Sequence, residues 1–165
     1  MTSIDPTTLT PAELGGMLQA WSAGLYPSEA AVGLLIAHGR WLRRRDFVTT
    51  LIDAVDDGWG PRGAVLPMAA IDWEAVPDYL TSAGGSSSEI AVLTLATSLA
   101  GVAVPSSLRD MTISLDDTNG RHLLDALAHG FGWHERGTVH TVTGHQDGGP
   151  DTGQATGATT RGRHA

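Results

Sequence analysis

The sequence contains no cysteine and no lysine. Without a cysteine among its 165 residues, the chain cannot form disulfides, thiolate zinc sites or iron–sulfur clusters, and it cannot use a cysteine nucleophile. Since lysine is absent, all ten basic residues are arginine. Alanine and glycine are abundant at the same time, which is typical of a GC-rich genome, so the arginine usage by itself has no functional meaning.

Long hydrophobic runs are also missing. The longest, Ala30–Ala37, is far shorter than the roughly 20 residues that a membrane-spanning helix needs, and Gly33 interrupts it. The first nine residues carry neither the basic nor the apolar stretch of a secretory signal. We therefore expect a cytoplasmic protein that makes no contact with a membrane.

Positive charge is scarce. The chain has 18 acidic and ten basic residues, which gives a formal net charge of −8. Nucleic-acid-binding proteins usually present a strongly basic face, so this balance argues against nucleic acid as a partner.

Composition divides the chain into three parts. Residues 1–9 are polar and are expected to be flexible. Residues 141–165 are rich in glycine, threonine and aspartate and cannot bury enough apolar surface to become ordered, which predicts a disordered C-terminal tail. Residues 10–140 predict a single helical domain. The expected fold class is mainly α, a compact bundle of about five to six short helices.

Capping residues mark where the helices begin. Thr10-Pro11-Ala12-Glu13 combines a capping hydroxyl, a proline at the first helical position and a glutamate three residues past the cap, which predicts a helix to about Ser22. Tyr26-Pro27-Ser28-Glu29 predicts a second helix that stops at Gly39. The same logic predicts four later helices. The first begins at Asp72 and runs through Leu80, and the second follows Gly84–Glu89 and stops at Gly101. The third begins at Ser106 or Ser107 and runs through Met111, and the fourth begins at Asp116 or Asp117 and ends near Gly130.

The segment that follows Asp46 allows two interpretations. Asp46 as a cap, with Phe47, Leu51 and Val55 on one face, favours a helix to about Asp56. The same residues have strand propensity, and the turn residues in 58–63 would complete a hairpin. The helix is preferred, and a small β-hairpin around residues 47–70 is the alternative.

Histidines cluster near the end of the predicted domain. His122 and His129 stand seven residues apart, hence on one face of the final helix, and suggest a metal-binding or small-ligand-binding enzyme. No His-Glu-x-x-His motif accompanies them. We therefore prefer to place His38 and His129 at helix ends, where the helix dipole favours a protonated or hydrogen-bonded imidazole. No metal or cofactor is predicted.

Two other polar motifs have a structural explanation. The glycine- and serine-rich loop 84–88 precedes a helix, as phosphate-binding loops do, but no lysine follows it and the Walker spacing is absent. Adjacent acids occur at Asp56-Asp57 and Asp116-Asp117, where capping is preferred to acid–base chemistry because neighbouring residues do not face each other. No catalytic residue is predicted.

The best candidate for an interaction patch is the segment that holds Arg40, Trp41, Arg43, Arg44 and Arg45. Guanidinium groups bind carboxylate and phosphate, and an aromatic ring beside them can stack. The alternative is a solvated helix end whose arginines pair with acids of the same chain while Trp41 points inward.

The chain resembles a family of small uncharacterised actinobacterial proteins. The resemblance covers roughly Leu25 to Gly132 and implies a host and a shared fold, but no activity. It rests on the segments Tyr26–Leu42, Asp46-Phe47, Met68–Trp73, Ser87–Glu89, Ser98–Gly101 and Leu115–Asn119.

Three hypotheses about function follow. The preferred one is a nonenzymatic helical module that binds another protein, with self-association allowed because five tryptophans offer much aromatic surface. The second is an enzyme or ligand-binding protein that uses His122 and His129. The third is a nucleic-acid-contacting helix-turn-helix factor with Arg109 and Arg121 facing phosphate, against which the net charge argues.

Overall fold

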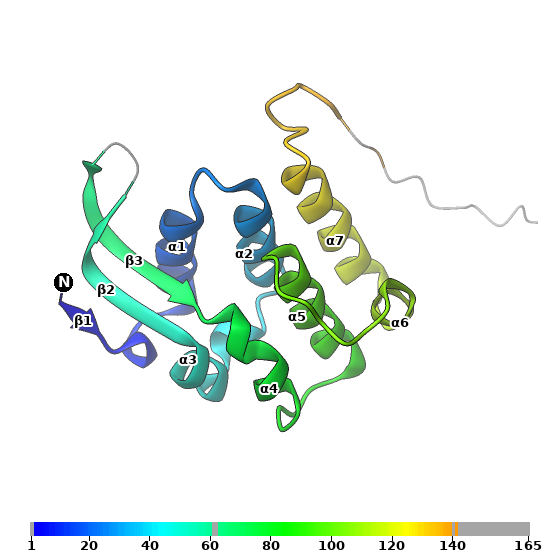
Figure 1. Ribbon diagram of the computed structural model, residues 1–165, viewed down its shortest axis with the longest axis horizontal. Coiled ribbons are helices and arrows are strands. Elements are labelled where there is room, and N and C mark those ends of the chain that lie inside the picture. The colour runs from blue at the N-terminus through cyan, green and yellow to red at the C-terminus, as the bar shows by residue number, and fades with distance from the viewer. Residues whose placement is uncertain (1, 61–62, 140, 142–165) are drawn as a thin grey trace, which may run out of the picture.

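The computed structural model describes residues 2–60, 63–139 and 141, and in this part of the chain it is mainly helical (Figure 1). None of these helices is long and apolar enough to cross a bilayer. The α-helices are α1 (Pro11–Ser22), α2 (Tyr26–His38), α3 (Arg45–Leu51), α4 (Val76–Leu80), α5 (Ser87–Leu99), α6 (Leu108–Ile113) and α7 (Asp117–Gly130). The strands are β1 (Ser3–Ile4), β2 (Ile52–Trp59) and β3 (Val65–Ile71). The short 3₁₀ helices are η1 (Pro6–Thr8), η2 (Trp41–Arg43) and η4 (Trp73–Ala75).

Most predicted helix starts are confirmed. Thr10 and Glu13 form a reciprocal capping box at α1, and Ser86 and Glu89 form another at α5. The side chains of Asp72, Ser107 and Asp116 each accept a hydrogen bond from the backbone three residues on. Gly39 ends α2 in the left-handed conformation with φ of 70°, and its amide donates to the Leu35 carbonyl.

The prediction of a helix to Asp56 was wrong beyond Leu51. Ile52 begins β2, which pairs antiparallel with β3 from Ile52 opposite Ile71 to Trp59 opposite Val65, with an irregularity between Val55 and Gly58. The hairpin alternative is therefore confirmed for this part of the segment. Asp46 does not cap α3, because its carboxylate instead accepts hydrogen bonds from Arg44 and Tyr79.

The N-terminal segment was expected to be flexible, but the structure places it against the sheet. Ser3 lies opposite Val55 and Ile4 opposite Ala54, so β1 is the third strand, in the order β1-β2-β3. Ile4 and Leu9 pack against the core, which explains why a mostly polar segment has a defined position.

The core surrounds α2, which lies between α1 on one side and α5 and α7 on the other (Figure 1). The sheet packs beyond α1, which contacts β3. The mainly helical prediction is thus confirmed, whereas the predicted bundle is not, because part of the core is covered by the sheet. The tail predicted to be disordered lies outside the described residues except for Thr141.

Trp41 connects η2 to α5 within the core. Its side chain is fully buried, its indole nitrogen donates to the Glu89 carbonyl at 3.0 Å, and its ring packs against those of Phe47 and Tyr79. A buried indole needs such a partner because an unpaired buried donor or acceptor destabilises the fold.

We expect Trp41→Phe to lower the free energy of unfolding by about 1–3 kcal/mol, because it removes this hydrogen bond and leaves a small cavity. Trp21→Phe makes the same chemical change on a side chain that is 58% exposed, and it should change stability by less than about 0.5 kcal/mol. Urea unfolding of both variants measures the difference, and equal effects would refute this account of Trp41.

Candidate functional site

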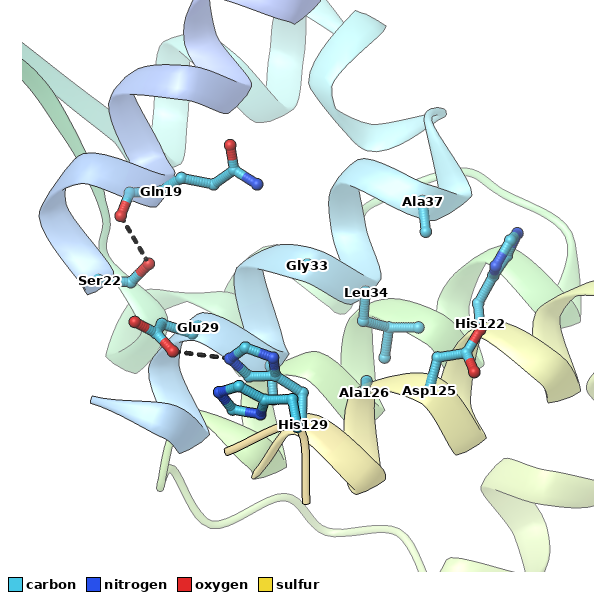
Figure 2. Close-up of a pocket in the computed structure, with 12 residues that line it drawn as sticks. Gln19, Ser22, Glu29, Gly33, Leu34, Ala37, His122, Asp125, Ala126 and His129 are labelled. Carbon is cyan, nitrogen blue, oxygen red and sulfur yellow. Dashed lines mark hydrogen bonds and ion pairs between the residues drawn. The ribbon is translucent and has the colours of Figure 1, made fainter. Parts of the chain in front are cut away.

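A pocket of about 530 Å³ opens between α1, α2 and α7 (Figure 2). We call it the His–Glu pocket. Five of its lining side chains can ionise, and the rest of the lining consists mainly of small or apolar residues. The lining residues are Gln19, Ser22, Glu29, Ala30, Gly33, Leu34, Ala37, His122, Asp125, Ala126, His129 and His134.

A short contact between Glu29 and His129 joins α2 to α7 in this pocket. The Glu29 Oε2 and His129 Nε2 atoms are 2.6 Å apart, and the Gly24 amide donates to Oε1 of the same carboxylate at 2.8 Å. Burial favours the neutral acid, but the bonds from His129 and Gly24 outweigh burial and hold the pKa of Glu29 below its ordinary value. Because a carboxylate only accepts, Nε2 is the donor, and the acceptor of the neutral ring is Nδ1.

Two aromatic neighbours fix the orientation of the His129 ring. The His134 ring is stacked on it at 4.2 Å between centroids with planes 4° apart, and Tyr26 meets both imidazoles edge-on at 6.1 and 5.2 Å. The turn that brings His134 back passes through Gly132 at a φ of 68°, where a Cβ atom would approach the Tyr26 ring to 3.0 Å. A glycine is therefore needed at this position.

The floor of the pocket is made of small residues on α2 and α7. Ala30, Gly33 and Ala37 follow one another along α2, and Ala126 lies on α7 (Figure 2). A Cβ atom added to Gly33 would have no neighbour within 4 Å. The hollow therefore exists because side chains here stop at the first carbon or before it.

The structure brings together the histidines that the sequence placed on one helix face. His122 and His129 both line the His–Glu pocket, with Asp125 between them on α7. Within the part of the chain that the structure describes, however, no group of three or more histidine, aspartate and glutamate side chains is arranged to hold a metal ion.

His38 and His129 lie in the last turns of α2 and α7, as predicted, and His129 is hydrogen-bonded as expected. His129 bonds across to Glu29. His38 Nδ1 is buried without a hydrogen-bond partner among the described residues, and burial lowers the pKa of this imidazole despite the nearby Glu89 carboxylate.

The predicted interaction patch separates into structural and exposed residues. Trp41 is buried, and the Arg44 guanidinium lies over its ring at 4.7 Å while bonding to Asp46 and to the Gly84 carbonyl. Arg40, Arg43 and Arg45 remain exposed, with Arg40 3.9 Å from a Glu89 oxygen. Trp41 is buried and Arg44 is paired with an acid of the same chain, as the alternative of a structural helix end predicted.

The remaining polar motifs have structural positions in the described part of the chain. The loop at 84–88 supplies the α5 cap, and Asp116 caps α7, as expected. Asp56 and Asp57 lie on β2 instead of a helix start, and Asp57 accepts from the Thr2 amide. Arg109 and Arg121 are exposed on α6 and α7, beside the acidic first turns of both helices.

Sequence reasoning missed Glu29 and His134 as members of the site. Glu29 was assigned only to a helix start, and His134 follows the end of α7. The available signal was the position of Glu29 and His129 near the ends of two helices that could pair, but their separation of 100 residues gives no local pattern.

Comparison with known proteins assigns neither a family nor a function to the chain. No protein-family model matches the chain, and no curated protein and no solved structure is significantly similar to it. The resemblance to the actinobacterial family therefore stays a prediction, and functional inference depends on the geometry.

The pair predicts a specific pH dependence of stability. Because the pKa of Glu29 is lowered in the folded state, the pair stabilises the fold above the ordinary value of 4.5, and this contribution is lost as the pH falls through the lower folded value. We expect Glu29→Gln to reduce the free energy of unfolding at pH 7 by about 1–2 kcal/mol, and the difference from the unmodified protein to shrink in acid.

Urea unfolding at several pH values tests this expectation. The matched control is Glu74→Gln, a change at an exposed glutamate, which should have little effect at pH 7. Equal stability of the Glu29→Gln variant and the unmodified protein at neutral pH would contradict the role of the pair.

Proposed function

We propose that the protein binds a small organic molecule in the His–Glu pocket. The observation that carries the proposal is the convergence of Glu29, His129 and His134 on a hollow of about 530 Å³. Small-molecule sites have volumes of about 300–1,000 Å³ and combine an apolar lining with a few oriented polar groups. This hypothesis follows the second of the sequence-based alternatives, without a metal.

The lining indicates what kind of molecule fits. The floor of Ala30, Gly33, Ala37 and Ala126 suits a compact apolar or aromatic body. When the His129 ring is neutral, Nε2 donates to Glu29 and Nδ1 is the acceptor, so that a donor group on the ligand can bond to Nδ1. A flat ligand can also stack against the exposed faces of the imidazole pair. The ligand is therefore expected to be a small ring compound with a hydrogen-bond donor.

Gly33 provides a direct test because it lies on the floor with open space above it. We expect Gly33→Leu to fill the pocket and abolish binding while the fold is retained, since the helix loses a flexible glycine and the new side chain has room. Gly16→Leu is the matched control. Gly16 also has no neighbour within 4 Å of an added Cβ, but it is exposed on α1 away from the pocket lining.

The measurement is a ¹H–¹⁵N NMR titration with a library of ring fragments that carry amine, amide or hydroxyl groups. Fragments should shift the His122, His129 and His134 signals in the unmodified protein and in the Gly16→Leu variant, but not in the Gly33→Leu variant. Fragments that bind all three proteins equally, or none that bind the unmodified protein, would overturn the proposal.

A second candidate function is self-association, which a different surface favours. An apolar groove of about 450 Å³ runs beside α6 and α7, lined by Leu95, Leu99, Met111 and Leu123 among others. Leu108, which lines the groove, is 66% exposed. Exposed apolar surface of this kind is typical of protein–protein contact sites.

Sedimentation velocity over a range of concentrations tests self-association. We expect Leu108→Asp to weaken a concentration-dependent dimer by about tenfold or more, since it places a charge in an apolar contact. Leu25→Asp makes the same change at a position that is 63% exposed and lies at the turn between α1 and α2, and it should leave the dimer intact. A protein that stays monomeric at all concentrations would exclude this second function.

A further inference from the structure

A second hollow lies on another part of the molecule, between η1 and the segment formed by η2 and α3. It measures about 600 Å³ and shares no lining residue with the His–Glu pocket. Leu9, Pro11, Leu42 and Val48 contribute apolar surface to it, and Arg43, Arg44 and Arg45 line the same groove. We call this hollow the arginine groove.

The three arginines of the groove have different tasks. Arg44 has a structural role, because its guanidinium donates to both carboxylate oxygens of Asp46 and to the Gly84 carbonyl. Arg43 Nε donates to the Gly39 carbonyl at 3.0 Å. Within residues 2–60 and 63–139, no carboxylate lies within ion-pair distance of Arg43 or Arg45. These two exposed guanidinium groups therefore have donors left for a ligand.

One carboxylate, that of Asp5, also lines the groove. It is occupied by the Thr7 hydroxyl at 2.7 Å and the Thr7 amide at 2.9 Å. These bonds, with a smaller contribution from the Arg45 charge, lower the pKa of Asp5. Asp5 thus offsets only one of the two available positive charges, and the groove keeps an excess of positive charge in a chain of net charge −8.

We propose that the arginine groove binds an acidic segment of a partner protein, in which an apolar residue stands between acidic residues. Arg43 and Arg45 would each take a carboxylate through paired N–H donors, since guanidinium forks match carboxylates in this way. The apolar residue would lie against Pro6, Leu9 and Pro11, which line the groove and are partly exposed. Clustered arginines are a recurring means of recognising acidic peptide motifs.

The composition of the groove distinguishes this occupant from other anions. An inorganic anion would leave the apolar surface unused. A nucleic acid would bring many phosphates to a protein with two available arginines here and a strongly negative total charge. The proposal is independent of the ligand proposed for the His–Glu pocket, because the two hollows are lined by different residues.

The experiment uses fluorescein-labelled peptides of the form Glu-Asp-X-Asp-Glu, with X as Leu, Phe or Val, and follows fluorescence anisotropy with the full chain. We expect saturable binding that weakens with salt. The double change of Arg43→Ala with Arg45→Ala should weaken binding by about tenfold or more. The matched control is Arg109→Ala with Arg121→Ala, which removes the same charge from exposed positions on α6 and α7 and should leave binding unchanged.

One further protein variant and one further peptide separate the contribution of the paired donors from that of the apolar residue. Changing Arg43 and Arg45 to lysine keeps the charge but not the paired donors, and should give intermediate affinity. Peptides with X as Ser should bind more weakly than those with X as Leu. The proposal is overturned if no peptide binds, if both double-alanine proteins lose affinity equally, or if inorganic phosphate at equal concentration displaces the peptide completely. Circular dichroism verifies the fold of each variant.

Discussion

The structure depends on the burial of α2 among three other helices. Ala30, Ala31, Val32, Leu34 and Leu35 are all buried, because α1, α5 and α7 pack against this mostly apolar helix. Small side chains allow the neighbouring helices to come close, as where a Cβ atom at Gly130 of α7 would lie 3.6 Å from that of Ala30. This close packing places α7, from the far end of the chain, beside a helix near the beginning, and it determines which polar residues can meet.

The candidate site is a consequence of the same packing. Glu29 is in the first turn of α2 and His129 in the last turn of α7, so the two helices carry opposite members of a bonded pair to the same end of their interface. Ala30 takes part in this close approach and also lines the hollow beside the pair, and Gly33 leaves space there because it has no side chain. Packing and the site therefore share Ala30.

Local signals in the sequence predicted the helices well and the site only in part. Thr10, Ser86 and Asp116 cap their helices through contacts that span three residues, so the pattern is visible without knowledge of the fold. The segment after Leu51 was mistaken for helix because Phe47, Leu51 and Val55 have helical spacing, while the strand partner that decides the outcome lies in β3. His122 and His129 could be placed on one face from their spacing. The contact between His129 and Glu29 could not be predicted, because it depends on how α2 and α7 pack.

The arginine segment shows how one short motif can serve both fold and surface. Trp41 is held in the core by its bond to Glu89, and Arg44 stacks on it and bridges to Asp46 and Gly84, so two residues of the motif attach η2 and α3 to α5 and the loop before it. A side chain anchored in this way fixes the backbone of its neighbours. Arg43 and Arg45 adjoin Arg44 in the chain, and both face the groove beside η1 with exposed guanidinium groups. The structural and the functional interpretation of this motif are therefore compatible, because Trp41 and Arg44 hold the backbone from which the exposed Arg43 and Arg45 extend.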